Sequence, residues 1–158
     1  MKKLIFILLL PLCFQSCSSN DSSSGDIEVI EEDYLIFGHY YGMCGGDSCV
    51  VTYKLTDDSL FEDVTKEYWG TDFNFIPMEQ DKFETVKDLL AHFPVNLLNE
   101  HEDFFGCPDC ADQGGLFIEY SKNGIIKNCR LDQTKNNVPS YLHPFMDKVN
   151  EKINLLYN

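Results

Sequence analysis

The stretch GLFIEYSKNGIIKNCRLD, residues 115–132, contains two runs of alternating apolar and polar residues that meet at Asn123-Gly124. An Asn-Gly pair favours the tight type I′ turn because both of its residues accept a positive φ. The stretch therefore predicts an antiparallel hairpin in which alternate side chains form an apolar face. The residues expected on that face are Leu116, Ile118, Tyr120, Ile125, Cys129 and Leu131, with Lys127 interrupting it.

Further strands are predicted before this hairpin. Residues 34–41 (YLIFGHYY) are rich in aromatic and apolar side chains, and residues 49–56 (CVVTYKLT) alternate between apolar and polar. Residues 72–78 favour another short strand, whereas residues 60–69 fit either a strand or an irregular segment. Most of the strands thus precede the hairpin in the chain.

Two segments predict helices. Apolar residues recur at helical spacing in residues 79–92 and again in residues 138–156. The order of elements is strands, helix, hairpin, helix, and every short connection between strands suits antiparallel pairing. The sequence therefore predicts an α+β domain with a single antiparallel sheet and two helices packed on one face.

The N-terminus has the features of an exported protein. Two lysines precede an apolar run of nine residues, 4–12, which suits a secretory signal and is too short for a membrane span of about 20 residues. The following CFQSCSSNDSSSGD resembles the end of a bacterial lipoprotein signal of the signal peptidase II type. The resemblance implies lipidation of Cys17, which follows the small residue Ser16; a cleaved signal without lipid is the alternative.

The chain divides into three parts on this interpretation. Residues 1–16 form the signal peptide. Residues 17–30 form a flexible polar tether, because residues 18–26 contain only Ser, Asn, Asp and Gly and cannot bury a core. Residues 31–158 form a single globular α+β domain, which is long enough for a substantial core.

Charge excludes one class of partner. The chain has 12 basic and 26 acidic residues and a formal net charge of −14. Removal of residues 1–16 takes away two of the 12 basic residues and none of the 26 acidic ones, which leaves −16. A nucleic-acid partner is not expected, because such binding depends on neutralising phosphates.

Five cysteines remain after residues 1–17 are set aside, and export would place them in an oxidising compartment. An odd count leaves at least one free thiol. Cys129 is the candidate, since it lies within a strand on the apolar side and a free cysteine is usually buried. The other four form two close pairs in loops, Cys44 with Cys49 and Cys107 with Cys110.

Three interpretations of these four cysteines stay open. The first is structural disulfides, either within each pair or crossed between the loops. The second is a zinc site of four thiolates, for which CPDC has a typical spacing. The third is a thiol–disulfide oxidoreductase using Cys107 and Cys110. This third interpretation is disfavoured because reactive pairs usually open a helix, whereas here acidic residues and then a strand follow.

Paired aromatic residues precede each cysteine loop. If the loops share one end of the sheet, these residues could frame a ligand surface pinned by disulfides. The alternative is that they pack beneath the loops as core. No nucleophile elbow, P-loop or dinucleotide fingerprint occurs, so no catalytic residue, cofactor or metal site is predicted. The surface candidates are Tyr40, Tyr41, Phe104 and Phe105.

The segments FGHYYGMC, SLFEDV, GCPDCADQGG, LDQ and VPSYLHPF are spread over nearly the whole mature region. On these segments the chain resembles an uncharacterised family of small lipoproteins from Bacteroidota. The resemblance implies a shared fold and a lipid anchor in the outer membrane. Whether the domain faces the periplasm or the cell surface stays open, and the resemblance identifies no catalytic residue.

The function predicted from these features is a lipid-anchored cell-envelope protein with a non-enzymatic binding or structural role. Its partners would be the membrane, through the N-terminal lipid, and an unidentified ligand or protein. The alternatives are a periplasmic thiol–disulfide oxidoreductase that uses the CPDC pair and a metal-binding lipoprotein that uses the loop cysteines.

Overall fold

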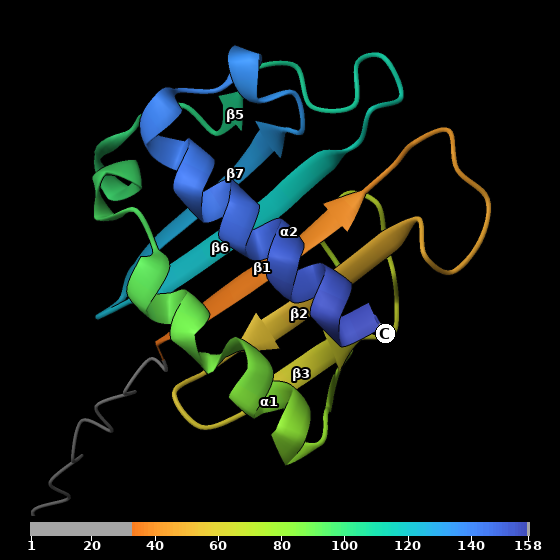
Figure 1. Cartoon of the computed structure of the whole chain (residues 1–158), viewed down its shortest axis with the longest axis vertical. Helices are drawn as coiled ribbons and strands as arrows, with labels where there is room; N and C mark the ends of the chain where they lie inside the picture. The colour runs from red at the N-terminus through yellow and green to blue at the C-terminus, as the bar shows by residue number, and fades with distance from the viewer. Residues whose placement is uncertain (1–32, 158) are drawn as a thin grey trace, which may run out of the picture.

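A seven-stranded sheet with the order β4-β3-β2-β1-β6-β7-β5 forms the centre of the computed structural model (Figure 1). The structure describes residues 33–157. The predicted signal peptide (residues 1–16), the tether (17–30) and Cys17 lie outside the described residues. The strands are β1 (Tyr34–Tyr40), β2 (Val50–Leu55), β3 (Leu60–Asp63), β4 (Phe75–Pro77), β5 (Phe104–Phe105), β6 (Gly115–Lys122) and β7 (Ile125–Asp132).

The predicted hairpin is present as β6 and β7. The two strands pair antiparallel from Gly115↔Asp132 to Lys122↔Ile125. Asn123 and Gly124 connect them with φ values of 51° and 76°, which are the positive values that a type I′ turn needs. The chemistry of the Asn-Gly pair thus accounts for the turn.

The α+β class is confirmed, but the sheet is not purely antiparallel. β5 pairs parallel with β7 through Phe104↔Arg130 and Phe105↔Leu131, while every other strand pair is antiparallel. The sheet is therefore mixed. A two-residue strand carries no sequence pattern, so only the packing of residues 104–105 against β7 reveals it.

The first predicted helix is divided. An α-helix, α1, spans Gln80–Val86, and a 3₁₀ helix follows at Lys87–His92. The backbone changes at Val86, where φ is −119°. The last helix, α2, spans His143–Tyr157, with Pro144 in its first turn, where the missing N–H is tolerated.

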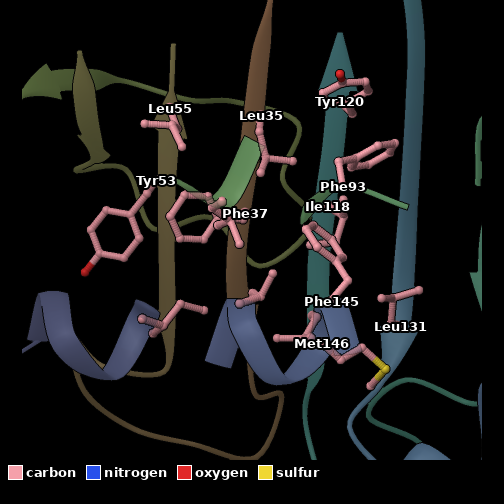
Figure 2. Packing of buried hydrophobic residues seen from close by; sticks show 14 of the residues in the cluster. Leu35, Phe37, Tyr53, Leu55, Phe93, Ile118, Tyr120, Leu131, Phe145 and Met146 are labelled. Atoms are coloured by element: carbon pink, nitrogen blue, oxygen red, sulfur yellow. The ribbon is translucent and has the colours of Figure 1, made fainter. Parts of the chain in front are cut away.

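One hydrophobic core joins the sheet to the helices. Alternate residues of the strands, such as Leu35, Phe37 and Ile118, belong to the same buried cluster as Phe145 and Met146 of α2. Figure 2 shows these side chains together, and Figure 1 shows α2 crossing in front of the sheet. Burial of apolar side chains on this scale is the main stabilising contribution to a domain of this size.

A second, smaller cluster lies on the opposite face of the sheet. It contains Ile36, Tyr40 and Phe117, whose positions alternate with those of the main core. β1 is therefore buried on both faces, and Leu35, Ile36 and Phe37 are all at most 4% exposed. The segment between β3 and β4, residues 64–74, contributes aromatic side chains to this cluster.

Lys127 interrupts the apolar face of the hairpin without leaving an unpaired charge. Its Nζ donates to the backbone oxygens of Glu100 (3.1 Å) and Glu102 (2.7 Å) and to Asp103 Oδ1 (2.8 Å). Cys129, two residues later in β7, is a buried free cysteine, as its place in the pattern predicts. Burial, the largest effect, raises the pKa of its thiol to about 12.

Candidate functional site

Both close cysteine pairs form disulfides within their own loops. Cys44 bonds to Cys49 with a Cα–Cα separation of 5.6 Å, and Cys107 bonds to Cys110 with 5.5 Å. The crossed alternative is therefore absent. In this oxidised form the four cysteines have no thiolate to offer a metal.

The two disulfide loops nevertheless lie at the same end of the sheet, the upper right of Figure 1. β1 ends and β6 begins there, because Tyr40 pairs with Gly115. Asp109, within the CPDC turn, accepts hydrogen bonds from Gly42 N (2.5 Å) and Gly114 N (2.9 Å). One carboxylate thus joins the turn to the neighbouring disulfide loop.

A second carboxylate holds the same turn against the sheet. Asp132, at the end of β7, accepts hydrogen bonds from Cys107 N (3.1 Å) and Gln113 Nε2 (3.1 Å). It also accepts from Thr134 N and Asn137 Nδ2, each at 2.7 Å. Burial opposes ionisation of Asp132, but these hydrogen bonds outweigh it and lower its pKa to about 2.

Residues 64–74, which connect β3 to β4, form the third loop at this end. Asp63 accepts hydrogen bonds from Thr65 N, Lys66 N and Asn74 N. Glu67 accepts from the backbone of Thr71 and Trp69, which lowers the pKa of its carboxyl. These bonds give the loop a defined shape without regular secondary structure.

This loop places Tyr68 and Trp69 between the two disulfide loops. The Tyr68 hydroxyl donates to Asp109 Oδ2 at 2.9 Å. Burial, and next this hydrogen bond, raise the pKa of Tyr68 to about 12, so it stays a donor at neutral pH. Asp109 therefore ties together all three loops.

Two hollows lie beside these aromatic residues. The first, which we call the aromatic pocket, has a volume of about 400 Å³. The second is similar in size, about 470 Å³, and lies over the Cys44–Cys49 loop. The aromatic pocket is lined by Tyr40, Tyr68, Trp69, Phe104, Gly106, Cys107, Pro108, Cys110 and Arg130.

Arg130 of β7 forms the floor of the aromatic pocket together with Tyr40. The guanidinium carbon lies 4.7 Å from the ring centroid of Tyr40 and 5.3 Å from that of Phe117. The ring of Trp69 is also near, with 5.8 Å between the guanidinium carbon and the ring centroid. The aromatic faces thus stabilise the cation through cation–π contacts.

The four aromatic residues predicted as a ligand surface do not form one surface. Phe105 is 3% exposed and belongs to the main core, whereas Phe104 is 61% exposed at the edge of the aromatic pocket. Consecutive residues of a strand point to opposite faces, so the two could not act together. Tyr40 is buried at the pocket floor, and half-buried Tyr41 borders the second hollow.

The sequence interpretation missed Tyr68, Trp69 and Arg130, which complete the aromatic pocket. Trp69 is the only tryptophan of the chain and is 63% exposed in a glycine-containing loop. Arg130 is the only arginine and occupies the strand position between Cys129 and Leu131, which marks it as facing away from the main core. The sequence therefore held two signals for these residues: tryptophan and arginine each occur once in the chain, and the alternation of β7 places Arg130 on the face opposite the main core.

Two kinds of feature, a membrane-spanning helix and a metal-binding cluster, are absent from the described part of the chain. No helix within residues 33–157 is long and apolar enough to cross a membrane. The same residues contain no group of three or more His, Cys, Asp or Glu side chains placed to hold a metal ion.

Comparison with known proteins does not assign the chain to a family. No protein-family model matches the chain, and no curated protein matches its sequence. The resemblance to small Bacteroidota lipoproteins therefore stays a prediction, and functional inference rests on the site itself.

Proposed function

We propose that the chain is a lipid-anchored cell-envelope protein whose domain binds a small ligand in the aromatic pocket, without catalysing a reaction. The observation that carries the proposal is the pairing of two exposed aromatic side chains, Trp69 and Phe104, across one hollow. A soluble domain normally buries such residues, and exposed aromatic groups around a concave site are typical of binding.

The rigidity of the surrounding loops supports binding. A disulfide closes the loop that supplies Cys107, Pro108 and Cys110 to the wall of the aromatic pocket. Asp109 joins that loop to its two neighbours through side-chain hydrogen bonds. A site held in its binding conformation loses less conformational entropy when a ligand binds.

The proposal assigns different features to the two faces of the sheet. Helices α1 and α2 would cover one face, because Phe83 of α1 and Val149 of α2 share a core cluster with Phe37 of the sheet. The opposite face would carry the aromatic pocket, since Tyr40 and Arg130 alternate with main-core positions.

The lipid anchor and the outer-membrane location rest on residues 1–17 of the sequence. They are tested by the Cys17→Ala change in cells supplied with a labelled fatty acid. We expect the wild-type chain to carry the label and to sediment with membranes, and the variant to do neither. Unchanged labelling and sedimentation of the variant would refute the anchor and leave the pocket untouched.

The oxidoreductase alternative is less well supported, although Cys107 and Cys110 are both exposed. The N–H of Cys107 donates to the carboxylate of Asp132, and Asp109 lies between the two cysteines. Negative groups near a thiol oppose formation of the reactive thiolate. A structural role of the disulfide in shaping the pocket fits these contacts better.

The binding proposal is tested by ligand-observed NMR with a library of small aromatic and aliphatic compounds. We expect a set of compounds that binds the wild-type chain and is lost in the Trp69→Ala, Phe104→Ala double variant. Tyr157→Ala, which removes a 64% exposed aromatic side chain at the end of α2, is the matched control and should keep every interaction. If no compound depends on Trp69 and Phe104, the aromatic pocket is not a binding site.

A further inference from the structure

The only arginine of this acidic chain lies at the floor of the aromatic pocket. Arg130 is 7% exposed, and the exposed part of the residue faces the hollow that it lines. The position is unusual because the chain carries 26 acidic residues that could have paired with it.

The hydrogen-bond partners of Arg130 are all neutral, although the carboxylate of Glu67 attracts Arg130 without forming an ion pair with it. Its guanidinium donates to the backbone oxygens of Tyr68 (3.5 Å) and Trp69. A hydrogen bond from Arg130 to the Tyr40 hydroxyl also opposes the burial that raises the pKa of Tyr40. Within residues 33–157, no carboxylate forms an ion pair with Arg130.

The two buried lysines behave differently. Lys127 pairs with Asp103 at 2.8 Å, and Lys152 pairs with Asp88 at 2.6 Å. Both lysines are as buried as Arg130, at 9% and 7% exposed. Buried charges in proteins are usually paired in this way, because an unpaired charge is costly to remove from water. Arg130 is therefore the exception among the buried cations of the described chain.

The walls above Arg130 suit a flat apolar group. Trp69 and Phe104 border the pocket, which at about 400 Å³ lies within the usual range for small-ligand sites. A carboxylate matches the planar fork of a guanidinium better than any other common anion except phosphate. Acidic residues far from the pocket repel an anion weakly, because salt screens charges beyond about 8 Å. Asp109 and Asp132 act on Tyr40 at the pocket floor and oppose anion binding, so the contact with Arg130 has to outweigh their repulsion.

We propose that the aromatic pocket binds a small organic carboxylate, with its anionic group against Arg130 and its flat apolar body between Trp69 and Phe104. This inference rests on the binding function proposed above and names the class of ligand. The ligand carboxylate would form the direct ion pair with Arg130 that no carboxylate within residues 33–157 makes.

The test uses 4-phenylbutyrate and its uncharged amide, 4-phenylbutyramide, as matched probes. Trp69 is the only tryptophan and lines both the aromatic pocket and the second hollow, so its fluorescence reports on binding beside it. Loss of the change in the Phe104→Ala variant assigns it to the aromatic pocket, because Phe104 lines that pocket and not the second hollow. We expect both probes to give a saturable change, with the carboxylate bound at least about tenfold more tightly, which corresponds to about 1.4 kcal/mol.

The Arg130→Met variant separates charge from shape. It keeps an extended apolar side chain and should bind the two probes equally. Because this change could unfold the loop above it, Arg130→Lys is the second variant; it keeps the charge and should retain a reduced preference for the carboxylate. The comparison of the two probes on the wild-type chain needs no substitution and stands even if both variants fail to fold.

Equal affinity of the wild-type chain for the two probes would overturn the proposed ligand class. So would the absence of any saturable change at millimolar concentration while other compounds still bind in a manner that depends on Trp69. Either result leaves the binding function standing. If no compound in the NMR experiment binds the wild-type chain in a manner that depends on Trp69 and Phe104, in contrast, the binding function itself is refuted.

Discussion

Individual carboxylates hold together the loops at the end of the sheet where the aromatic pocket lies. Asp63, Asp109 and Asp132 each accept hydrogen bonds from loop backbone N–H groups. A loop has no ladder partners for these donors, so side-chain acceptors must satisfy them where water is excluded. Three residues of one type therefore define the loops that surround the aromatic pocket.

Asp132 makes the stability of the domain depend on pH in the acid range. Its folded-state pKa is about 2, below the ordinary value of 3.8 that the unfolded chain retains. The stabilisation is therefore complete above about pH 4 and is lost as the pH falls through 2. We expect the free energy of unfolding in urea to decline over this interval.

The Asp132→Asn variant identifies the group responsible. It should lose about 1–3 kcal/mol relative to the wild-type chain at pH 5, because buried donors lose an ionised acceptor. The difference should shrink toward pH 2, where the wild-type carboxyl is also protonated. Asp112→Asn, at an exposed position whose positive φ of 58° asparagine also tolerates, is the control. A difference that is constant with pH would contradict this role of Asp132.

At the scale of elements, the loop between β3 and β4 contributes Tyr68 and Trp69 to the site. It leaves an edge of the sheet, yet Gly70 packs on Phe117 of the central strand β6. Gly70 has a φ of 61°, which L-residues rarely adopt. A backbone this close to an aromatic ring leaves no room for a side chain.

The Gly70→Ala variant should displace this loop. A Cβ there would lie 2.9 Å from Cε2 of Phe117, and the positive φ adds about 1–2 kcal/mol of strain. We expect a lower free energy of unfolding and a changed fluorescence of the neighbouring Trp69. Gly45→Ala is the matched control, because a Cβ at that glycine meets no atom within 4 Å. Equal behaviour of the two variants would show that the loop does not depend on its contact with Phe117.

At the scale of the whole molecule, the disulfides and the core have separate roles. Each disulfide closes a short ring, with sequence separations of 5 and 3. The main core consists of side chains from the sheet and from the helices and contains none of the four bonded cysteines. The bonds therefore constrain loops at one end of a domain that is stabilised elsewhere.

Reduction should accordingly leave the domain folded. Each ring contributes about 2 kcal/mol by the loop-entropy relation, so both together contribute about 4 kcal/mol. We expect dithiothreitol to lower the free energy of unfolding by that amount while the far-UV circular dichroism stays unchanged. Variants in which both cysteines of each pair are replaced by serine cannot form either disulfide and provide the control for side reactions of the reductant. A reduced chain that is unfolded without denaturant would contradict this separation.

The sequence by itself determined the α+β class, the β6–β7 hairpin and the buried position of Cys129. These follow from short-range signals: the Asn123-Gly124 turn and the alternation of apolar residues on either side of it. The parallel strand β5 had no such signal, because two residues cannot show a period.

Only the tertiary structure decided the connectivity of the disulfides and the composition of the aromatic pocket. Tyr40, Trp69, Phe104 and Arg130 lie in four separate segments of the chain, and their meeting depends on strand order and on a loop held by carboxylates. Local and crossed disulfides both suited the sequence, because the choice depends on the distance between two loops. Periodicity fixes which way a side chain faces, whereas the neighbours of that side chain depend on how distant segments pack.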